Sequence, residues 1–138
     1  MLAFDAIKVG QRLPDLLSPP ISRTTLALYA GASGDHNPNH IDSDFARASG
    51  MGDVLAHGML SMAYLGRLLT GWAPQQQIRH FDVRFVSIAR VDDSIRCSGE
   101  VIEKIEYNRE KLVSVRLQAV DQHGNVKLTG SATTVYLS

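Results

Sequence analysis

The second half of the chain alternates apolar and polar residues with the period of β-strands. Phe81, Val83 and Phe85 are separated by charged residues, so their side chains fall on one face of an extended segment. The alternation recurs at Ile95–Val101, resumes after a shift at Ile105 and Tyr107, and returns at Val113–Ala119 and at Val126–Ala132. The pattern therefore predicts four long, half-buried strands.

Turn-forming residues separate these predicted strands. Asn108-Arg109 and His123-Gly124-Asn125 lie where the chain has to reverse, which favours antiparallel pairing of consecutive strands. We expect one further strand within residues 11–22. The three prolines of that segment restrict it to a sheet edge, because proline has no N–H group to donate to a neighbouring strand.

Helical patterns dominate the first half of the chain. The Thr-Thr pair at 24–25 can cap a helix that ends at Gly34. A second, short helix, DSDFARAS, begins at Asp42 or Ser43 and ends at Gly50.

A third helix, predicted over Ala56–Trp72, is apolar on nearly every side, and Arg67 is its only charge. A helix with this pattern is buried, so other elements have to wrap it. One long, curved antiparallel sheet around one central helix satisfies both patterns. We therefore expect an α+β protein with the hot-dog fold, as one domain over residues 1–138.

Composition narrows the functional classes. Fourteen Lys and Arg balance fourteen Asp and Glu, so the formal net charge is zero and no overall field favours nucleic acid or an anionic membrane. The single cysteine, Cys97, excludes an internal disulfide and a cysteine-based metal cluster. Because no run is long enough to span a bilayer and the start does not resemble a signal peptide, we expect a cytoplasmic protein.

Candidate chemistry is concentrated in the segment YAGASGDHNPNHID, residues 29–42. Asp35 and His40 can act as an acid–base pair that holds a water, with Pro38 stiffening the loop between them. The alternative is a polar turn in which Asp35 or Asn37 bonds nearby backbone donors. We expect no metal, since Pro38 disfavours the helix that would place His36 and His40 on one face.

The start of the central helix offers a second candidate group. In Ala56-His57-Gly58-Met59, Gly58 lies where backbone N–H groups have no partner and the helix dipole is positive. A carbonyl oxygen can approach a residue that lacks Cβ, and the N–H groups would stabilise charge developing on that oxygen. The alternative is that Gly58 only permits close packing.

The two motifs GDHNPNH (34–40) and AHGML (56–60) together resemble the MaoC-like family of hot-dog dehydratases. That family includes (R)-specific enoyl-CoA hydratases and the catalytic subunits of mycobacterial (3R)-hydroxyacyl dehydratases. The resemblance covers nearly the whole chain. It implies reversible addition of water to trans-2-enoyl thioesters, giving (R)-3-hydroxyacyl thioesters, without a cofactor.

The resemblance also implies roles for individual residues. Asp35 and His40 would orient and activate the water, and the backbone N–H of Gly58 would polarise the thioester carbonyl. We expect further substrate contacts from Asn37, which also holds the loop, and from His57, Met59 and Tyr64. The chain departs from the family at Gly66, where a serine is common, which leaves the acyl specificity open.

The implied substrates are thioesters of coenzyme A or of acyl carrier protein. The resemblance further implies at least a dimer, because one hot-dog unit covers only one side of its helix. We expect a homodimer, with a heterodimer containing a second hot-dog subunit as the alternative. Two other functions remain open from sequence: an acyl-CoA thioesterase of the same fold, and a non-catalytic acyl-binding subunit.

Overall fold

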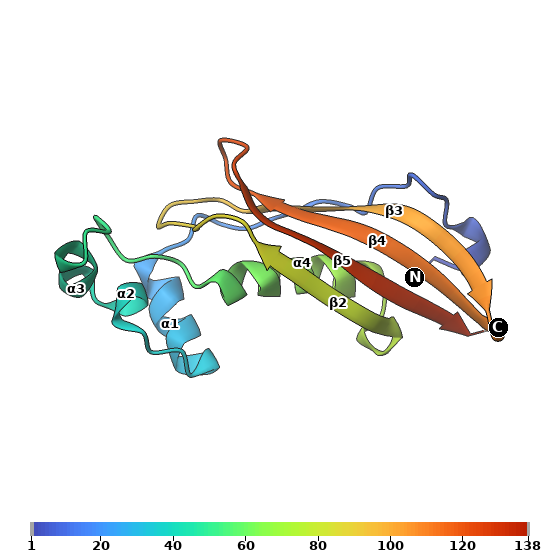
Figure 1. Cartoon of the computed structure of the whole chain (residues 1–138), viewed down its shortest axis with the longest axis horizontal. Helices are drawn as coiled ribbons and strands as arrows, with labels where there is room; N and C mark the ends of the chain where they lie inside the picture. Colours follow the sequence, from blue (N-terminus) through green and yellow to red (C-terminus); the bar gives the residue numbers. More distant parts are fainter. Residues whose placement is uncertain (1, 138) are drawn as a thin grey trace.

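Five strands form one curved antiparallel sheet in the computed structural model, which describes residues 2–137 (Figure 1). The strand order is β1-β3-β4-β5-β2. The strands are β1 (Leu16–Leu17), β2 (Ile78–Phe85), β3 (Arg96–Tyr107), β4 (Glu110–Val120) and β5 (Val126–Leu137). The predicted strands and the hot-dog architecture are confirmed.

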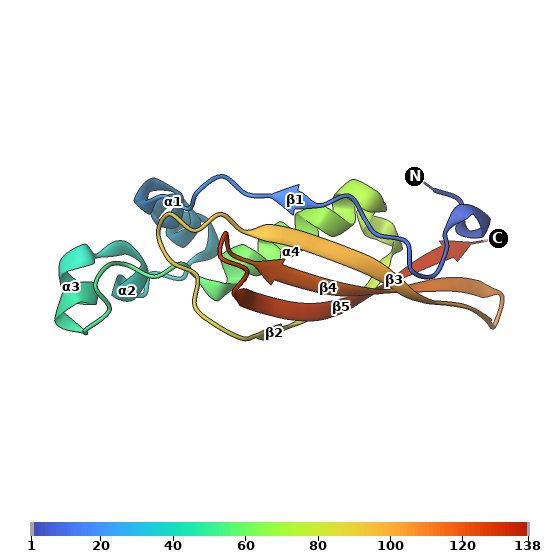
Figure 2. The same ribbon diagram turned by 90° about the horizontal axis from the view of Figure 1, so that it is seen from above.

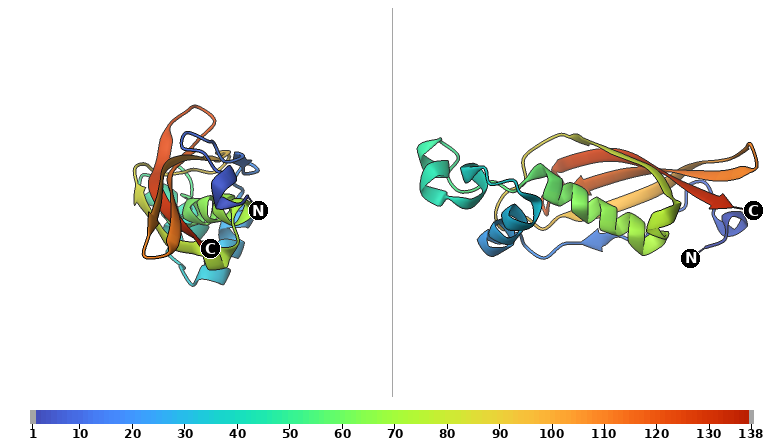
Figure 3. Two further views of the ribbon diagram at one scale, coloured as in Figure 1. Left: turned by 90° about the vertical axis from the view of Figure 1, so that its right-hand side faces the viewer. Right: turned by 90° about the horizontal axis from the view of Figure 1, so that it is seen from below.

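Within residues 2–137, four α-helices accompany the sheet: α1 (Arg23–Ser33), α2 (Pro38–Ile41), α3 (Ser43–Ala48) and α4 (Gly58–Trp72). The same described residues include two 3₁₀ turns, η1 (Phe4–Ala6) and η2 (Gln75–Gln77). Helix α4 lies along the concave face of the sheet (Figure 3), whereas α1, α2 and α3 gather beyond one end of the sheet, near the start of α4 (Figure 2). No helix within residues 2–137 is long and apolar enough to cross a membrane.

The sheet follows the sequence pattern closely. The shift predicted before Ile105 is a register irregularity between Val101 and Glu103 in the β3–β4 pairing. Asn108 and Arg109 turn the β3–β4 hairpin with positive φ angles of 49° and 65°. The edge strand expected within residues 11–22 is β1, which pairs with β3 through two residues.

Helix α4 is covered on one face only. Its buried residues recur at helical spacing toward the sheet: Leu60, Ser61, Tyr64, Leu65, Leu68 and Leu69. The opposite face is open, and Met59 there is 52% exposed. One chain therefore covers only one side of its central helix, as expected for a single hot-dog unit, because a sheet of five strands curls around only part of a helix.

Two helix starts differ from the sequence expectation. Ser22, rather than a threonine of the pair at 24–25, caps α1 by accepting a hydrogen bond from the Thr25 N–H. The segment after Asn37 contains the unexpected one-turn helix α2, since proline is well tolerated at the first helical position. Asp42 caps α3 as predicted, accepting from two backbone N–H groups.

Candidate active site

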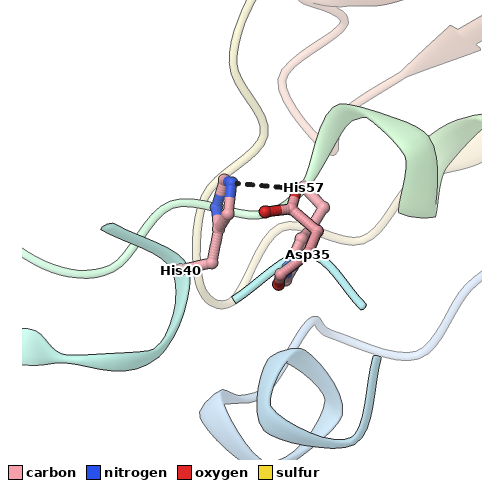
Figure 4. A group of neighbouring side chains, drawn as sticks. All are labelled: Asp35, His40 and His57. Atoms are coloured by element: carbon pink, nitrogen blue, oxygen red, sulfur yellow. Dashed lines mark hydrogen bonds and ion pairs between the residues drawn. The ribbon is translucent and has the colours of Figure 1, made fainter. Parts of the chain in front are cut away.

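Asp35 and His40 face each other (Figure 4). They belong to the segment of α1 and α2, which lies beyond one end of the sheet (Figure 2). The Asp35 Oδ2 atom lies 3.8 Å from His40 Nε2, and the side chains are 51% and 17% exposed, respectively. Asp35 follows Gly34, which ends α1 in the left-handed conformation with φ of 79°. His40 projects from α2. A water molecule can sit about 2.8 Å from both atoms at the apex of a triangle, within reach of solvent.

Short-range hydrogen bonds hold the loop that carries Asp35. The Asn37 N–H donates to Asp35 Oδ1 over 3.2 Å, and the Asp35 N–H donates to Ser33 Oγ over 3.2 Å. The Asn37 side chain caps α2 by accepting from the Asn39 N–H at 3.0 Å. Asn37 therefore links the carboxylate to the helix that bears His40.

A backbone carbonyl fixes the orientation of the His40 ring. His40 Nδ1 lies 2.7 Å from the Leu55 carbonyl oxygen, and the Leu55 N–H in turn donates to the Asn39 carbonyl over 2.9 Å. Because a carbonyl only accepts, Nδ1 carries the proton. In the neutral imidazole the lone pair is then on Nε2, the atom that faces Asp35.

His57 packs directly behind the pair. Its ring stacks on that of His40 with centroids 3.9 Å apart and an interplanar angle of 25°, and the Tyr29 ring meets it edge-on at 4.8 Å. His57 Nε2 donates to the Asp35 carbonyl oxygen over 3.2 Å. Burial lowers the pKa of His57, and the neighbouring His40 acts in the same direction. Burial and the charge of Asp35 raise the pKa of Tyr29.

Gly58 begins α4 immediately after His57, which takes the N-cap position. A Cβ atom at Gly58 would lie 2.8 Å from Cε1 of the Phe85 ring, so the ring fills the space that any larger residue needs. A cavity of about 280 Å³ adjoins Gly58 and is lined by Ser61, Phe85, Lys127, Leu128 and the loop 86–89. The first N–H groups of α4 thus lie beside a small, largely apolar cavity.

The remaining predicted contact residues lie apart from this cluster. Met59 is on the open face of α4, and Tyr64 packs in the core with 8% exposure, where burial raises its pKa. Asn37 is exposed and acts on the loop through its backbone and its cap. Substrate contact by these residues stays a prediction.

Sequence reasoning missed three contributors to the site. The Leu55 carbonyl orients His40, but every residue has a carbonyl, so the sequence carries no signal for it. Phe85 was assigned only to a strand, although it packs on Gly58. Tyr29 was named only as the first residue of the segment 29–42, and no feature of the sequence marks its contact with His57.

Asp35, His40 and His57 are also the residues whose ligand atoms could hold a metal ion, with these atoms within 4.8 Å of one another. The geometry suits coordination poorly. An imidazole binds a metal in its ring plane, whereas these two rings stack face to face, so their lone pairs do not converge on one point between the rings. The arrangement suits proton transfer to and from a water better.

The fold and this cluster define a class: a hot-dog protein with a carboxylate–imidazole pair at the N-terminus of its central helix. The chain belongs to the family of the MaoC like domain, whose model matches residues 7–123.

Curated relatives and solved structures agree with this placement. The chain is 28% identical to an (R)-specific enoyl-CoA hydratase of Rhodospirillum rubrum, over 96% of this chain and 90% of the relative. It is 29% identical to a 3-hydroxybutyryl-CoA dehydratase of Methylorubrum extorquens, over 96% and 82% of the two chains. Among solved structures, the R-hydratase PhaJ1 of Pseudomonas aeruginosa superimposes with a TM-score of 0.83 at 28% identity, covering 96% of this chain and 83% of that one.

Proposed function

We propose that the protein adds water reversibly across the double bond of trans-2-enoyl thioesters, giving (R)-3-hydroxyacyl thioesters. The observation that carries the proposal is the Asp35–His40 pair, 3.8 Å apart with the His40 Nε2 lone pair turned toward the carboxylate. The names of relatives that share the fold and most of the chain's length support the same reaction.

The proposed mechanism uses this pair to activate one water. His40 Nε2 takes a proton from the water while the Asp35 carboxylate accepts a hydrogen bond from its other hydrogen. The water oxygen then bonds to the β-carbon of the substrate, and the π electrons move toward the thioester carbonyl. When the enolate collapses, the α-carbon takes the proton back from His40 Nε2, so the site returns to its starting state.

Gly58 is the proposed partner of the developing enolate. Its N–H group lies in the first turn of α4, where the amide has no acceptor within the helix and the dipole favours negative charge. A preorganised donor of this kind stabilises the transition state more than the ground state, which is what accelerates a reaction.

We also propose that two copies of the chain join along β2. This strand ends one side of the sheet and is eight residues long, whereas the opposite edge, β1, has only two residues. Apolar side chains stand exposed where β2 ends, with Phe85 at 54%, Val86 at 52% and Ile88 at 48%. Each homodimer would then contain two copies of the site.

Light scattering of the chain expressed alone tests this assembly. Val86→Asp should shift the species from dimer to monomer mass, whereas Val9→Asp, at a remote exposed position, should leave the mass unchanged. A wild-type monomer that is soluble and active would contradict the dimer. An inactive chain rescued by a co-expressed hot-dog partner would select the heterodimer instead.

The activity test is the hydration of crotonyl-CoA by the purified protein. We expect the absorbance of the conjugated enoyl thioester to fall without release of a free thiol, and (R)-3-hydroxybutyryl-CoA to accumulate. Release of thiol would select the thioesterase, and no reaction with enoyl thioesters of any length would favour the non-catalytic acyl-binding subunit. Acyl carrier protein thioesters should be compared in the same assay. The cytoplasmic location and the single domain over 1–138 stay predictions.

A further inference from the structure

We propose that His57 is a positioning residue that holds Asp35 and His40 in register, rather than a group that binds substrate. The inference rests on the proposed hydration reaction and deepens it. The contacts of the His57 imidazole with Asp35 and His40 support a positioning role. Its burial keeps it from touching the substrate.

His57 reaches both members of the pair through different parts of its ring. The ring face stacks on His40 with centroids 3.9 Å apart, and Nε2 donates to the backbone carbonyl of Asp35 over 3.2 Å. Since Gly58 follows directly, one residue relates the acid–base pair to the start of α4.

The His57 side chain has no surface free for a ligand. It is 1% exposed, and Tyr29 closes its edge at a centroid distance of 4.8 Å. Nδ1 is buried and has no hydrogen-bond partner within the described residues. A proton on Nδ1 would therefore be an unsatisfied buried donor, whereas a bare nitrogen costs less, so His57 remains neutral beside His40.

A neutral, immobile ring is what the pair requires from its neighbour. His40 changes charge during the proposed cycle, and a second cationic imidazole at stacking distance would oppose each proton transfer. A neutral ring instead fixes the plane of His40 and keeps Nε2 directed at Asp35. An offset of about 1 Å in such a pair is enough to lower turnover about 10²-fold.

Two variants separate the two contacts. His57→Phe keeps a ring for stacking but removes the donor to Asp35, and His57→Asn keeps a donor but removes the stack. We expect each to lower kcat about 10-fold or more, in both hydration and dehydration, with KM changed less than threefold, and His57→Ala to lower kcat about 10²-fold. A raised KM with unchanged kcat would overturn the proposal and assign His57 to substrate binding.

Leu69→Ala is the matched control for a general loss of stability. Leu69 is fully buried near the far end of the same helix and touches none of the three site residues. If Leu69→Ala lowered kcat as much as His57→Ala at equal loss of stability, the positioning role would be refuted. An unchanged kcat in Leu69→Ala supports it.

A measurement without substrate keeps the proposal distinct from the proposed reaction. In ¹⁵N NMR of the imidazole groups, wild-type His40 should show one tautomer, protonated at Nδ1, and an Overhauser contact to the His57 ring. In His57→Ala the Leu55 carbonyl still holds the Nδ1–H tautomer, but the plane of the His40 ring should become mobile, so we expect exchange broadening of the His40 ring resonances. Unchanged line widths of these resonances would overturn the inference. If wild-type protein fails to hydrate enoyl thioesters, the reaction is refuted, and the NMR result still decides the positioning role.

Discussion

The sheet and the helical segment 22–58 are held together by different physics. The sheet uses long ladders in which each residue repeats the contacts of its neighbours, over eleven paired positions between β3 and β4, for example. The helical segment has short helices whose ends depend on single side chains, namely Ser22, Asn37 and Asp42. When one paired position of a ladder is lost, the neighbouring pairs still hold the two strands together. When one capping side chain is lost, no second side chain replaces it.

The site lies in the segment with less redundancy. Asp35, His40 and His57 come from a loop, a one-turn helix and an N-cap, and their side chains meet (Figure 4). The sheet contributes a rigid support for α4, whose first residues complete the site. Changes in the sheet should therefore act on stability, and changes in the segment should act on catalysis.

The largest effect should come from the acid–base pair. We expect Asp35→Asn and His40→Ala each to lower turnover about 10²–10⁴-fold while the thermal unfolding midpoint changes little. The double variant should be little worse than the worse single one, because the two residues act as a unit. His36→Ala is the control, since His36 is an exposed histidine of the same loop. Near-normal turnover by either folded variant would remove the pair from the mechanism.

A core substitution in the sheet should give the reverse result. Leu117 is 1% exposed between the sheet and α4, so Leu117→Ala should lower the free energy of unfolding by about 2–5 kcal/mol. The kcat of the folded fraction should stay near the wild-type value. Urea titration gives the stability, and a loss of kcat beyond the loss of folded protein would show that the two regions are not separable.

The start of α4 tests the boundary between the two regions. Gly58→Pro removes the proposed carbonyl donor and should lower kcat about 10²–10³-fold. Gly58→Ala places the same Cβ against the Phe85 ring but keeps the N–H group, so it reports the packing cost alone. Equal turnover by the two variants would show that the N–H group of Gly58 is not the donor.

A smaller effect is expected from the cap that links Asp35 to α2. Asn37→Ala removes the acceptor for the Asn39 N–H and should cost about 0.5–2 kcal/mol of stability. Asn37→Ser retains a capping oxygen and should behave almost as wild type. Urea unfolding measures the stability of both variants, and hydrogen exchange measures how strongly the α2 amides are protected. Equal protection of these amides in Asn37→Ala and Asn37→Ser would contradict the capping role.

The smallest effect concerns pH. The pKa of His57 is lowered in the folded protein from 6.5, chiefly by burial, so below about pH 6.5 the unfolded chain binds a proton that the folded one does not. The contribution of His57 to stability is therefore complete above that pH and falls as the pH decreases. In His57→Phe the free energy of unfolding should depend less steeply on pH between pH 7 and pH 5. An unchanged slope would show that His57 titrates alike in both states.

The sheet could be predicted from the sequence because its signal is local. Alternation of apolar and polar residues determines which face each strand buries, and the shift before Ile105 marked the irregularity after Val101. The start of α1 was harder to predict, since Ser22 and the threonines at 24–25 are all good capping residues and only the fold selects among them.

The site was predictable only in part. Asp35 and His40 lie five residues apart, so their spacing within one motif allowed the hypothesis of a pair. The stack of His57 on His40 joins residues seventeen positions apart and depends on how the segment 42–56 folds back. The periodicity of a sequence does not contain that information.

The short distance between Asp35 and His40 has a stereochemical consequence. Two groups that sandwich a planar enoyl chain would need to stand about 7 Å apart, twice the contact distance of carbon atoms. The Asp35 and His40 atoms are 3.8 Å apart, so both approach the substrate from the same side. In the proposed reaction, hydroxyl and hydrogen therefore add to one face of the double bond. Hydration in heavy water should give a single diastereomer, with deuterium at the α-carbon syn to the new hydroxyl group.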